Sequence, residues 1–154
     1  MKKINKKLFK KVLGKFSTGI TVVSINSIDS KIGKTVNSFT ALSLSPPLVL
    51  FSLDKKSSSL IKYKKSKLFG INILTNKQSN ISINFAKKNA QWNNIPNFSS
   101  SLGTPFIKDC IANIECINLK SFKEGDHILF ICKVLNASYS NDLKPLLYGS
   151  GGYL

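Results

Sequence analysis

The sequence contains no arginine, and all 23 of its basic residues are lysines, set against seven acidic residues for a net charge of +16. Recognition of guanine edges and tight forked contacts with phosphate favour arginine, so its absence argues against specific nucleic-acid binding. Lysine alone can supply non-specific affinity, so a basic protein associated with nucleic acid stays the least favoured alternative. Asparagine and isoleucine are also abundant. This composition is typical of an AT-rich genome, so the charge is weak evidence of function.

Side chains that carry out chemistry by themselves are scarce. The sequence has one histidine, no Ser-His-Asp arrangement that spacing supports, no Walker loop and no strand-linked GxGxxG. Its three cysteines, Cys110, Cys116 and Cys132, lack CxxC spacing and are too few for a disulfide framework, so we expect small core residues and no metal site. If the protein is an enzyme, a bound cofactor should supply the reactive group.

The sequence also lacks a signal peptide and any apolar run long enough to span a bilayer. We therefore expect a soluble, cytoplasmic protein without a membrane partner, folded as one domain over residues 1–154. In the basic segment MKKINKKLFKKVLGKF, Leu8, Phe9, Val12 and Leu13 recur at helical spacing, and Gly14 provides a stop. This pattern predicts a short amphipathic helix docked on the domain, with a membrane-surface helix as the less favoured alternative.

The rest of the chain has mainly the pattern of β-strands. Hydrophobic periodicity and turn residues predict strands at residues 20–28, 34–40, 48–53, 68–74, 111–122 and 127–139, with turns at 29–31 and 124–126. Short helices are expected from an N-cap at Ser57 or Ser58 through Lys65 and over residues 78–88, and residues 89–104 are expected to form a long irregular connection. Because no βαβ alternation occurs, the predicted fold is mainly β, an antiparallel barrel with a few flanking helices.

One segment, residues 35–53 with the sequence TVNSFTALSLSPPLVLFSL, has the character of a ligand-facing edge followed by core. Val36, Phe39 and Leu42 are apolar, and the short polar side chains between them offer hydrogen-bond donors and acceptors. Such an edge suits a flat ligand with a polar rim. Pro46 and Pro47 should interrupt strand pairing, and the apolar run that follows is typical of a buried strand.

This segment, continued as DKKSSSL, resembles the flavin reductase family, small reductase components that share an FMN-binding split β-barrel. The blocks FSTGITVVS, EGDHILFICKV and LLYGSGGY occur around it in the family's order, from about Phe16 to Tyr153. The resemblance implies a homodimeric NAD(P)H:flavin oxidoreductase that transfers hydride from NADH or NADPH to FMN or FAD. Reduced flavin would then pass to a separate monooxygenase. A non-catalytic FMN-binding protein of the same fold is the alternative.

The resemblance also implies a set of cofactor-binding residues. Those expected along the isoalloxazine ring and ribityl chain are Thr35, Asn37, Ser38, Phe39 and Thr40. Ser57, Ser58 and Ser59 occupy the family's flavin-phosphate position, and hydroxyls with free backbone N–H groups at a helix start suit an anion independently of the resemblance. Lys87 is expected to add positive charge there, as Lys55 and Lys56 could.

Three further residues are expected near the reacting groups. His127, in GDHILF, matches the block in which the family's histidine faces the flavin and the nicotinamide, so we expect it to position the nicotinamide or stabilise negative charge on the flavin. Tyr148 and Tyr153 match the family's aromatic positions near the cofactor. The chain has Ser150, Gly151 and Gly152 where the family often carries bulkier or charged residues, which leaves the choice between NADH and NADPH open.

Overall fold

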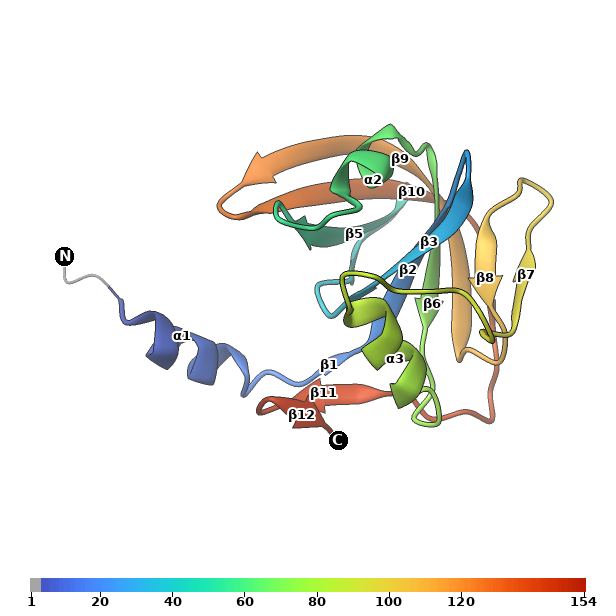
Figure 1. Cartoon of the computed structure of the whole chain (residues 1–154). Helices are drawn as coiled ribbons and strands as arrows, with labels where there is room; N and C mark the ends of the chain where they lie inside the picture. Colours follow the sequence, from blue (N-terminus) through green and yellow to red (C-terminus); the bar gives the residue numbers. More distant parts are fainter. Residues whose placement is uncertain (1–3) are drawn as a thin grey trace.

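The computed structural model describes residues 4–154 and is built around one antiparallel sheet of seven strands in the order β3-β2-β6-β9-β10-β5-β4 (Figure 1). The sheet strands are β2 (Thr21–Ser27), β3 (Ser30–Val36), β4 (Thr40–Leu44), β5 (Pro47–Asp54), β6 (Leu68–Ile73), β9 (Ala112–Glu124) and β10 (His127–Tyr139). Shorter strands are β1 (Thr18–Gly19), β7 (Asn97–Ser99), β8 (Pro105–Ile107), β11 (Leu147–Gly149) and β12 (Gly152–Tyr153). The helices are α1 (Lys6–Leu13), α2 (Leu60–Lys65) and α3 (Ser79–Ala86). The expected antiparallel, mainly β fold with few short helices is confirmed.

The barrel core is aromatic. Along β5 the side chains alternate between buried and less buried, which places Phe51 inside. Its ring stacks on Phe130 at 5.0 Å, and Phe69 meets both rings edge-on at 5.3 and 5.6 Å. Such offset and edge-to-face contacts add to the stabilisation from burial, so β5, β6 and β10 are held together by one cluster.

A second core cluster fastens α3 to the sheet. Ile81 and Phe85 of α3 pack with Val22 and Leu74, and the Trp92 ring lies 4.9 Å from that of Phe85. A Cβ atom at Gly33 of β3 would lie 2.6 Å from the Phe85 ring, so glycine is needed for α3 to approach β3 this closely.

The strand expected over residues 34–40 is confirmed only for its first part, because β3 ends at Val36 and β4 begins at Thr40. β3 and β4 are the two outer strands of the sheet order, so residues 37–39 link its two edges. Ser38 fixes this link, since its Oγ accepts a hydrogen bond from the Ser52 N–H (2.9 Å) and donates one to the Ser52 carbonyl (3.1 Å).

Two smaller expectations also need correction. The N-cap of α2 is Ser59 rather than Ser57 or Ser58, and its side chain makes no capping hydrogen bond. The connection over residues 89–104 is not wholly irregular, because β7 lies within it and pairs with β8. In that pairing the ring centroids of Phe98 and Phe106 lie 5.5 Å apart. The aromatic side chain of Phe98 therefore holds the connection to its own chain. All three cysteines are buried, as expected for core residues, and burial raises the pKa of Cys110 to about 12.

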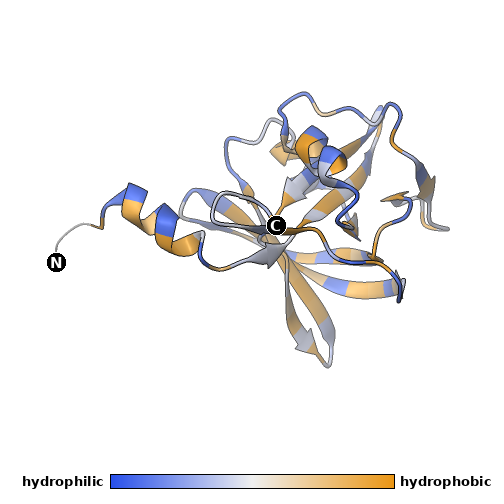
Figure 2. Cartoon of the chain, turned by 90° about the horizontal axis from the view of Figure 1, so that it is seen from below, coloured by the Kyte–Doolittle hydropathy of each residue, from blue (hydrophilic) through white to orange (hydrophobic). Residues whose placement is uncertain are grey.

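The helix expected near the N-terminus forms as α1, but its expected docking on the barrel is wrong. None of the residues of α1 is buried, and the helix extends away from the barrel (Figure 1). Figure 2 shows an apolar stripe along it, where Leu8, Phe9, Val12 and Leu13 are each about half exposed. Residues 1–3 of the segment lie outside the described residues. Within residues 4–154, the helices fall short of the length and apolarity that crossing a membrane requires.

Candidate functional site

Two neighbouring cavities lie on either side of α3 and the chain that follows it. The first, which we call the tyrosine cavity, has a volume of about 300 Å³. It brings together four of the predicted residues from distant parts of the chain, namely Thr35, Asn37, Tyr148 and Tyr153, and adds Ile20, Val36, Ser82 and Ala86. Tyr148 of β11 pairs with Tyr153 of β12, and their rings lie 5.6 Å apart at 76°. The lining of this cavity therefore combines two aromatic rings with the polar side chains of Thr35, Asn37 and Ser82.

Ser82 is the residue of this cavity that sequence reasoning missed. It is fully buried on α3 and joins two of the predicted side chains. The Thr35 hydroxyl donates to the Ser82 carbonyl (2.7 Å), and the Tyr153 hydroxyl donates to Ser82 Oγ (2.8 Å). The sequence indicated only the burial of Ser82, because this residue lies three residues before Phe85 on the helix face that was expected to be buried.

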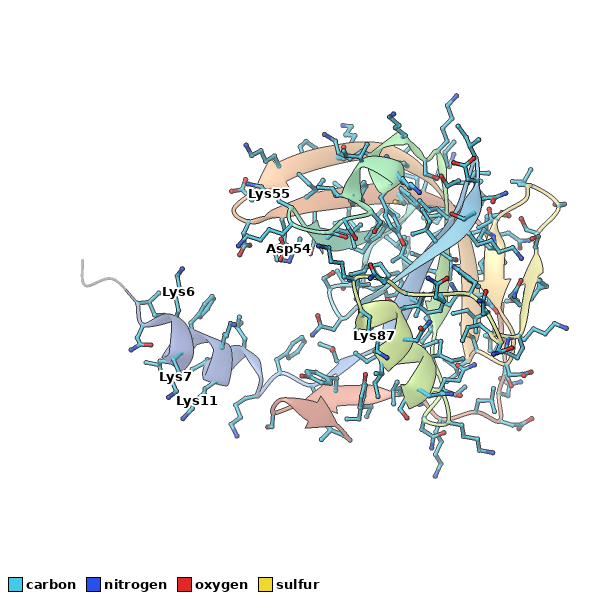
Figure 3. All side chains as sticks on the ribbon, in the orientation of Figure 1. Lys6, Lys7, Lys11, Asp54, Lys55 and Lys87 are labelled. Atoms are coloured by element: carbon cyan, nitrogen blue, oxygen red, sulfur yellow. The ribbon has the colours of Figure 1, made fainter. Side chains whose placement is uncertain are left out.

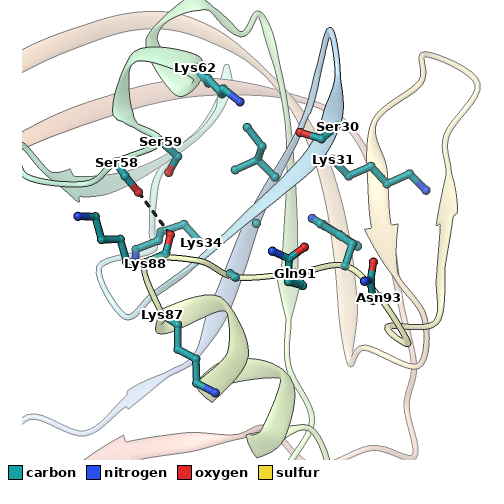
Figure 4. A pocket seen from close by; sticks show the side chains of 14 residues that line it. Ser30, Lys31, Lys34, Ser58, Ser59, Lys62, Lys87, Lys88, Gln91 and Asn93 are labelled. Carbon is teal, nitrogen blue, oxygen red and sulfur yellow. Dashed lines mark hydrogen bonds between the residues drawn. The ribbon is translucent and has the colours of Figure 1, made fainter.

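The second cavity, which we call the lysine cavity, has a volume of about 500 Å³ and lies between α2, β3 and the chain after α3 (Figure 4). Five lysines line it, and its fourteen described lining residues include no acidic side chain. They are Ser30, Lys31, Ile32, Gly33, Lys34, Ser58, Ser59, Lys62, Lys87, Lys88, Ala90, Gln91, Trp92 and Asn93. Three predicted residues, Ser58, Ser59 and Lys87, belong to this set, and Ser58 Oγ donates to the Lys88 carbonyl at 3.4 Å. The cavity offers hydroxyls and ammonium groups, which suit an anion.

Residues adjacent in the sequence line the two cavities. Successive residues of β3 line the lysine cavity up to Lys34 and the tyrosine cavity from Thr35. The same change occurs at the end of α3, where Ala86 lines the tyrosine cavity and Lys87 lines the lysine cavity. Lys34 Nζ donates to the Ala86 carbonyl at 3.0 Å, so one hydrogen bond marks the boundary. A ligand with a flat aromatic part and an anionic end fits this arrangement.

Four predicted contact residues line neither cavity. The Ser38 hydroxyl is used by the Ser52 backbone, and Phe39 packs against the barrel core. Thr40 is exposed on β4. The Ser57 hydroxyl lies 3.2 Å from that of Ser59 and so contacts a lining residue. Their contact with a ligand stays a prediction.

His127 lies apart from both cavities, at the start of β10. The strand register places it opposite Asp54 of β5, and its side chain is 45% exposed. Its Nδ1 lies 2.7 Å from Asp126 Oδ1, and this hydrogen bond lowers the pKa of the Asp126 carboxyl. In Figure 3, Asp54 and Lys55 lie at the edge of the barrel above the open space beside α1. His127, opposite Asp54 in the strand register, therefore lies at this edge of the barrel and lines neither cavity.

The chain belongs to the family described as "Flavin reductase like domain", whose model matches residues 13–154. The FMN reductase (NADH) SmoA of Agrobacterium fabrum is 34% identical over 149 residues, which cover 97% of this chain and 85% of that protein. The reductase subunit HsaB of a flavin-dependent monooxygenase from Mycobacterium tuberculosis is 38% identical over 153 residues, with coverages of 97% and 82%.

Solved structures agree with this assignment. The flavin reductase PheA2 superposes with a TM-score of 0.91 at 36% identity, covering 98% of this chain and 97% of PheA2. The NADH:FAD oxidoreductase SgcE6 of Streptomyces globisporus gives 0.92 at 27% identity, covering 100% and 96%. The expected split-barrel fold of flavin reductases is thereby confirmed.

Proposed function

We propose that this protein is an NAD(P)H-dependent flavin reductase that binds its flavin across the two cavities. The observation that carries this proposal is that an aromatic cavity and a lysine-lined one are built from adjacent residues of β3 and of the end of α3, in a chain of the flavin reductase family. An isoalloxazine ring is flat with a polar edge, which the tyrosine cavity suits, and a phosphate is an anion, which the lysine cavity suits. The residues present therefore fit a flavin.

Within this assignment, the residues of the tyrosine cavity hold the ring. Tyr148 and Tyr153 provide aromatic surface, and Asn37 offers an amide to the ring's polar edge. Thr35 is held in place by Ser82, so its position does not depend on the ligand. Ser58 and Ser59 donate to the phosphate, and Lys87 and Lys88 balance its charge. When bound, the flavin supplies the group that accepts hydride, so the protein's part is to bind, orient and exclude water.

His127 is proposed to orient the nicotinamide. Its Nδ1 is paired with Asp126, which leaves Nε2 as the nitrogen able to meet a ligand. Because His127 lines neither cavity of its own chain, the nicotinamide is proposed to bind in the space outside them, beside β10. A second subunit that enters this space would complete the site.

We propose a homodimer for this reason and for one other. The apolar stripe of α1 (Leu8, Phe9, Val12 and Leu13) is exposed in the single chain, and a contiguous exposed apolar face of this kind marks an interaction surface. Completing the burial of four half-exposed side chains is worth about 1 kcal/mol each, or about 4 kcal/mol per subunit. In a two-fold symmetric dimer both subunits bury the same stripe, so each adds this contribution to the stability of the interface.

The partner that receives reduced flavin is proposed to be a separate monooxygenase, since HsaB is by name the reductase subunit of such an enzyme. The cytoplasmic location and the single domain over residues 1–154 stay predictions.

The test is steady-state oxidation of NADH and of NADPH by the purified protein, with and without added FMN or FAD. We expect oxidation that depends on flavin. Flavin binding without oxidation of either nucleotide would favour the non-catalytic FMN-binding protein instead. Absence of flavin binding would remove the assignment of both cavities.

A further inference from the structure

A third cavity lies between the β7–β8 pair and strands β9 and β10. It has a volume of about 200 Å³, and we call it the glutamate cavity. Its lining includes Phe98 of β7, Phe106 of β8, Asn113 and Glu115 of β9, and Asn136 of β10. None of its described lining residues belongs to the tyrosine or the lysine cavity, and β7 and β8 lie at the opposite end of the molecule from α1 (Figure 1). The glutamate cavity is therefore separate from the proposed flavin site.

The polar side of this cavity follows from the alternation of β9. Cys116 belongs to the barrel core, and Ile114 packs against it. Because successive side chains of a strand point to opposite faces, Asn113 and Glu115 face away from that core. The strand register places Asn136 of β10 opposite Glu115. Two neighbouring strands thus bring one carboxylate and two amides to the same cavity.

Glu115 is only 4% exposed, and one of its two carboxylate oxygens lacks a partner. The Ser100 hydroxyl donates to Oε1 at 2.5 Å, and Ser100 Oγ is itself held by the N–H groups of Leu102 and Thr104. Glu115 Oε2 makes no hydrogen bond or ion pair with any described residue, and it is not sealed off, so it opens to the cavity. Burying a carboxylate without a cationic partner is costly, so this oxygen is the point at which a cation would bind.

The rest of the lining adds an acceptor and aromatic surface. Asn113 Nδ2 donates to Asn72 Oδ1 (2.9 Å) and to the Ile107 carbonyl (3.4 Å). Its own Oδ1 accepts no hydrogen bond from the described part of the chain, so it is available to a donor on a ligand. The rings of Phe98 and Phe106 lie 5.5 Å apart, and a cation is attracted to the face of such a ring.

A guanidinium group matches this combination. It is planar and always charged, carries several N–H donors and no acceptor, and stacks on aromatic rings. Lysine, although abundant in the chain, is absent from the described lining of the cavity, and the chain contains no arginine. The guanidinium group therefore has to come from another molecule and not from a second copy of this chain.

We propose that the glutamate cavity binds a guanidinium group, with Glu115 Oε2 and Asn113 Oδ1 as acceptors and the phenylalanine rings as the stacking surface. The source is an arginine side chain of another protein or a small free guanidinium compound, and both present the same chemistry to the cavity. Its volume of about 200 Å³ leaves room for the methylene groups that carry the guanidinium group. This inference does not depend on the flavin site.

The experiment is a titration of the isotope-labelled protein with methylguanidinium chloride, followed by NMR chemical shifts. An ionic strength of about 0.15 M screens long-range repulsion by the lysines. We expect saturable shifts for residues 98–106, 113–115 and 136–138, and none with sodium chloride at the same concentration. Glu115→Gln should weaken binding about tenfold, because it removes the charge and keeps an oxygen acceptor. Glu124→Gln is the matched control, since Glu124 ends the same strand, is exposed and does not line the cavity.

A second variant and a second ligand sharpen the test. Ser138→Leu places a larger apolar side chain at an exposed position of the lining, so it should obstruct the cavity and weaken binding with the barrel core intact. N-acetylarginine amide that binds as tightly as methylguanidinium would identify an arginine side chain as the source. Its exclusion from the cavity would identify a small free compound.

The inference is overturned if methylguanidinium gives no saturable shifts, or if Glu115→Gln and Glu124→Gln weaken binding equally. Equal binding of methylammonium would also overturn it, because the cavity would then select positive charge and not the guanidinium group. If Glu115→Gln does not fold, unchanged binding by Ser138→Leu is the result that contradicts the site.

Discussion

Replacing Ser58 and Ser59 together by alanine should weaken FMN binding but not riboflavin binding. Both residues line the lysine cavity, and riboflavin differs from FMN only by lacking the phosphate. A hydrogen bond to a charged group is worth about 1.5–3 kcal/mol, and the cavity is open to solvent, so we take the lower value for the pair as a whole. The expected loss for FMN is then about tenfold, with riboflavin changed by less than about twofold.

The assay is a fluorescence titration of both ligands at constant ionic strength. Ser57→Ala is the matched control, because the Ser57 hydroxyl contacts Ser59 and does not line the cavity. It should lower FMN affinity much less than the double variant does. Equal losses for riboflavin and FMN would mean that the serines hold the ring or the fold and not the phosphate. Equal affinities of wild-type protein for the two ligands would remove the phosphate site from this cavity.

Two other predictions concern assembly and stability. The double variant Leu8→Lys and Val12→Lys should be a monomer in light scattering at micromolar concentration, because charge on the apolar stripe of α1 opposes its burial in a dimer interface. The control Lys6→Gln, also on α1, should leave the dimer intact. A monomeric wild-type protein would contradict the proposed dimer. Gly70→Ala should lower the free energy of unfolding by about 1–3 kcal/mol in urea titrations, because its Cβ would lie 2.6 Å from Ser24 Oγ and 2.9 Å from the Pro105 carbonyl. Gly19→Ala, with no atom within 4 Å of the added Cβ, is the control, and equal effects of the two would contradict this packing argument.

Local patterns predicted most of the sheet, because the long strands are apolar runs or alternating segments bounded by turn residues. The apolar residues of β5 and β10 alternate as buried and less buried positions, and the turn at Gly125 separates β9 from β10 as expected. The position at which β3 ends could not be predicted from local patterns. Residues 37–39 continue the mixture of polar and apolar side chains that is typical of a strand. Only the position of β3 and β4 at opposite edges of the sheet requires the chain to pass from one edge to the other at these residues.

The candidate site was predictable in part for a similar reason. Thr35, Asn37, Tyr148 and Tyr153 were expected from their motifs, and the fold brings them to one cavity. Ser82 was missed because its role depends on the meeting of α3 with β3 and β12, which no local pattern records. The full extent of the lysine cavity was missed as well, since Lys62 and Gln91 line it together only because α2 and the chain after α3 both lie beside β3.

Anaerobic stopped-flow reduction of bound FMN by NADH tests the reductase assignment most directly. With FMN saturating, wild-type protein should bleach the flavin band, and His127→Ala should do so on the order of 100-fold more slowly, because a misplaced nicotinamide loses the geometry for hydride transfer. FMN affinity should be the same in both, since His127 lines neither cavity. Equal rates would remove His127 from the site and leave the reductase assignment standing. Failure of the wild-type protein to bleach flavin with either NADH or NADPH would contradict the account.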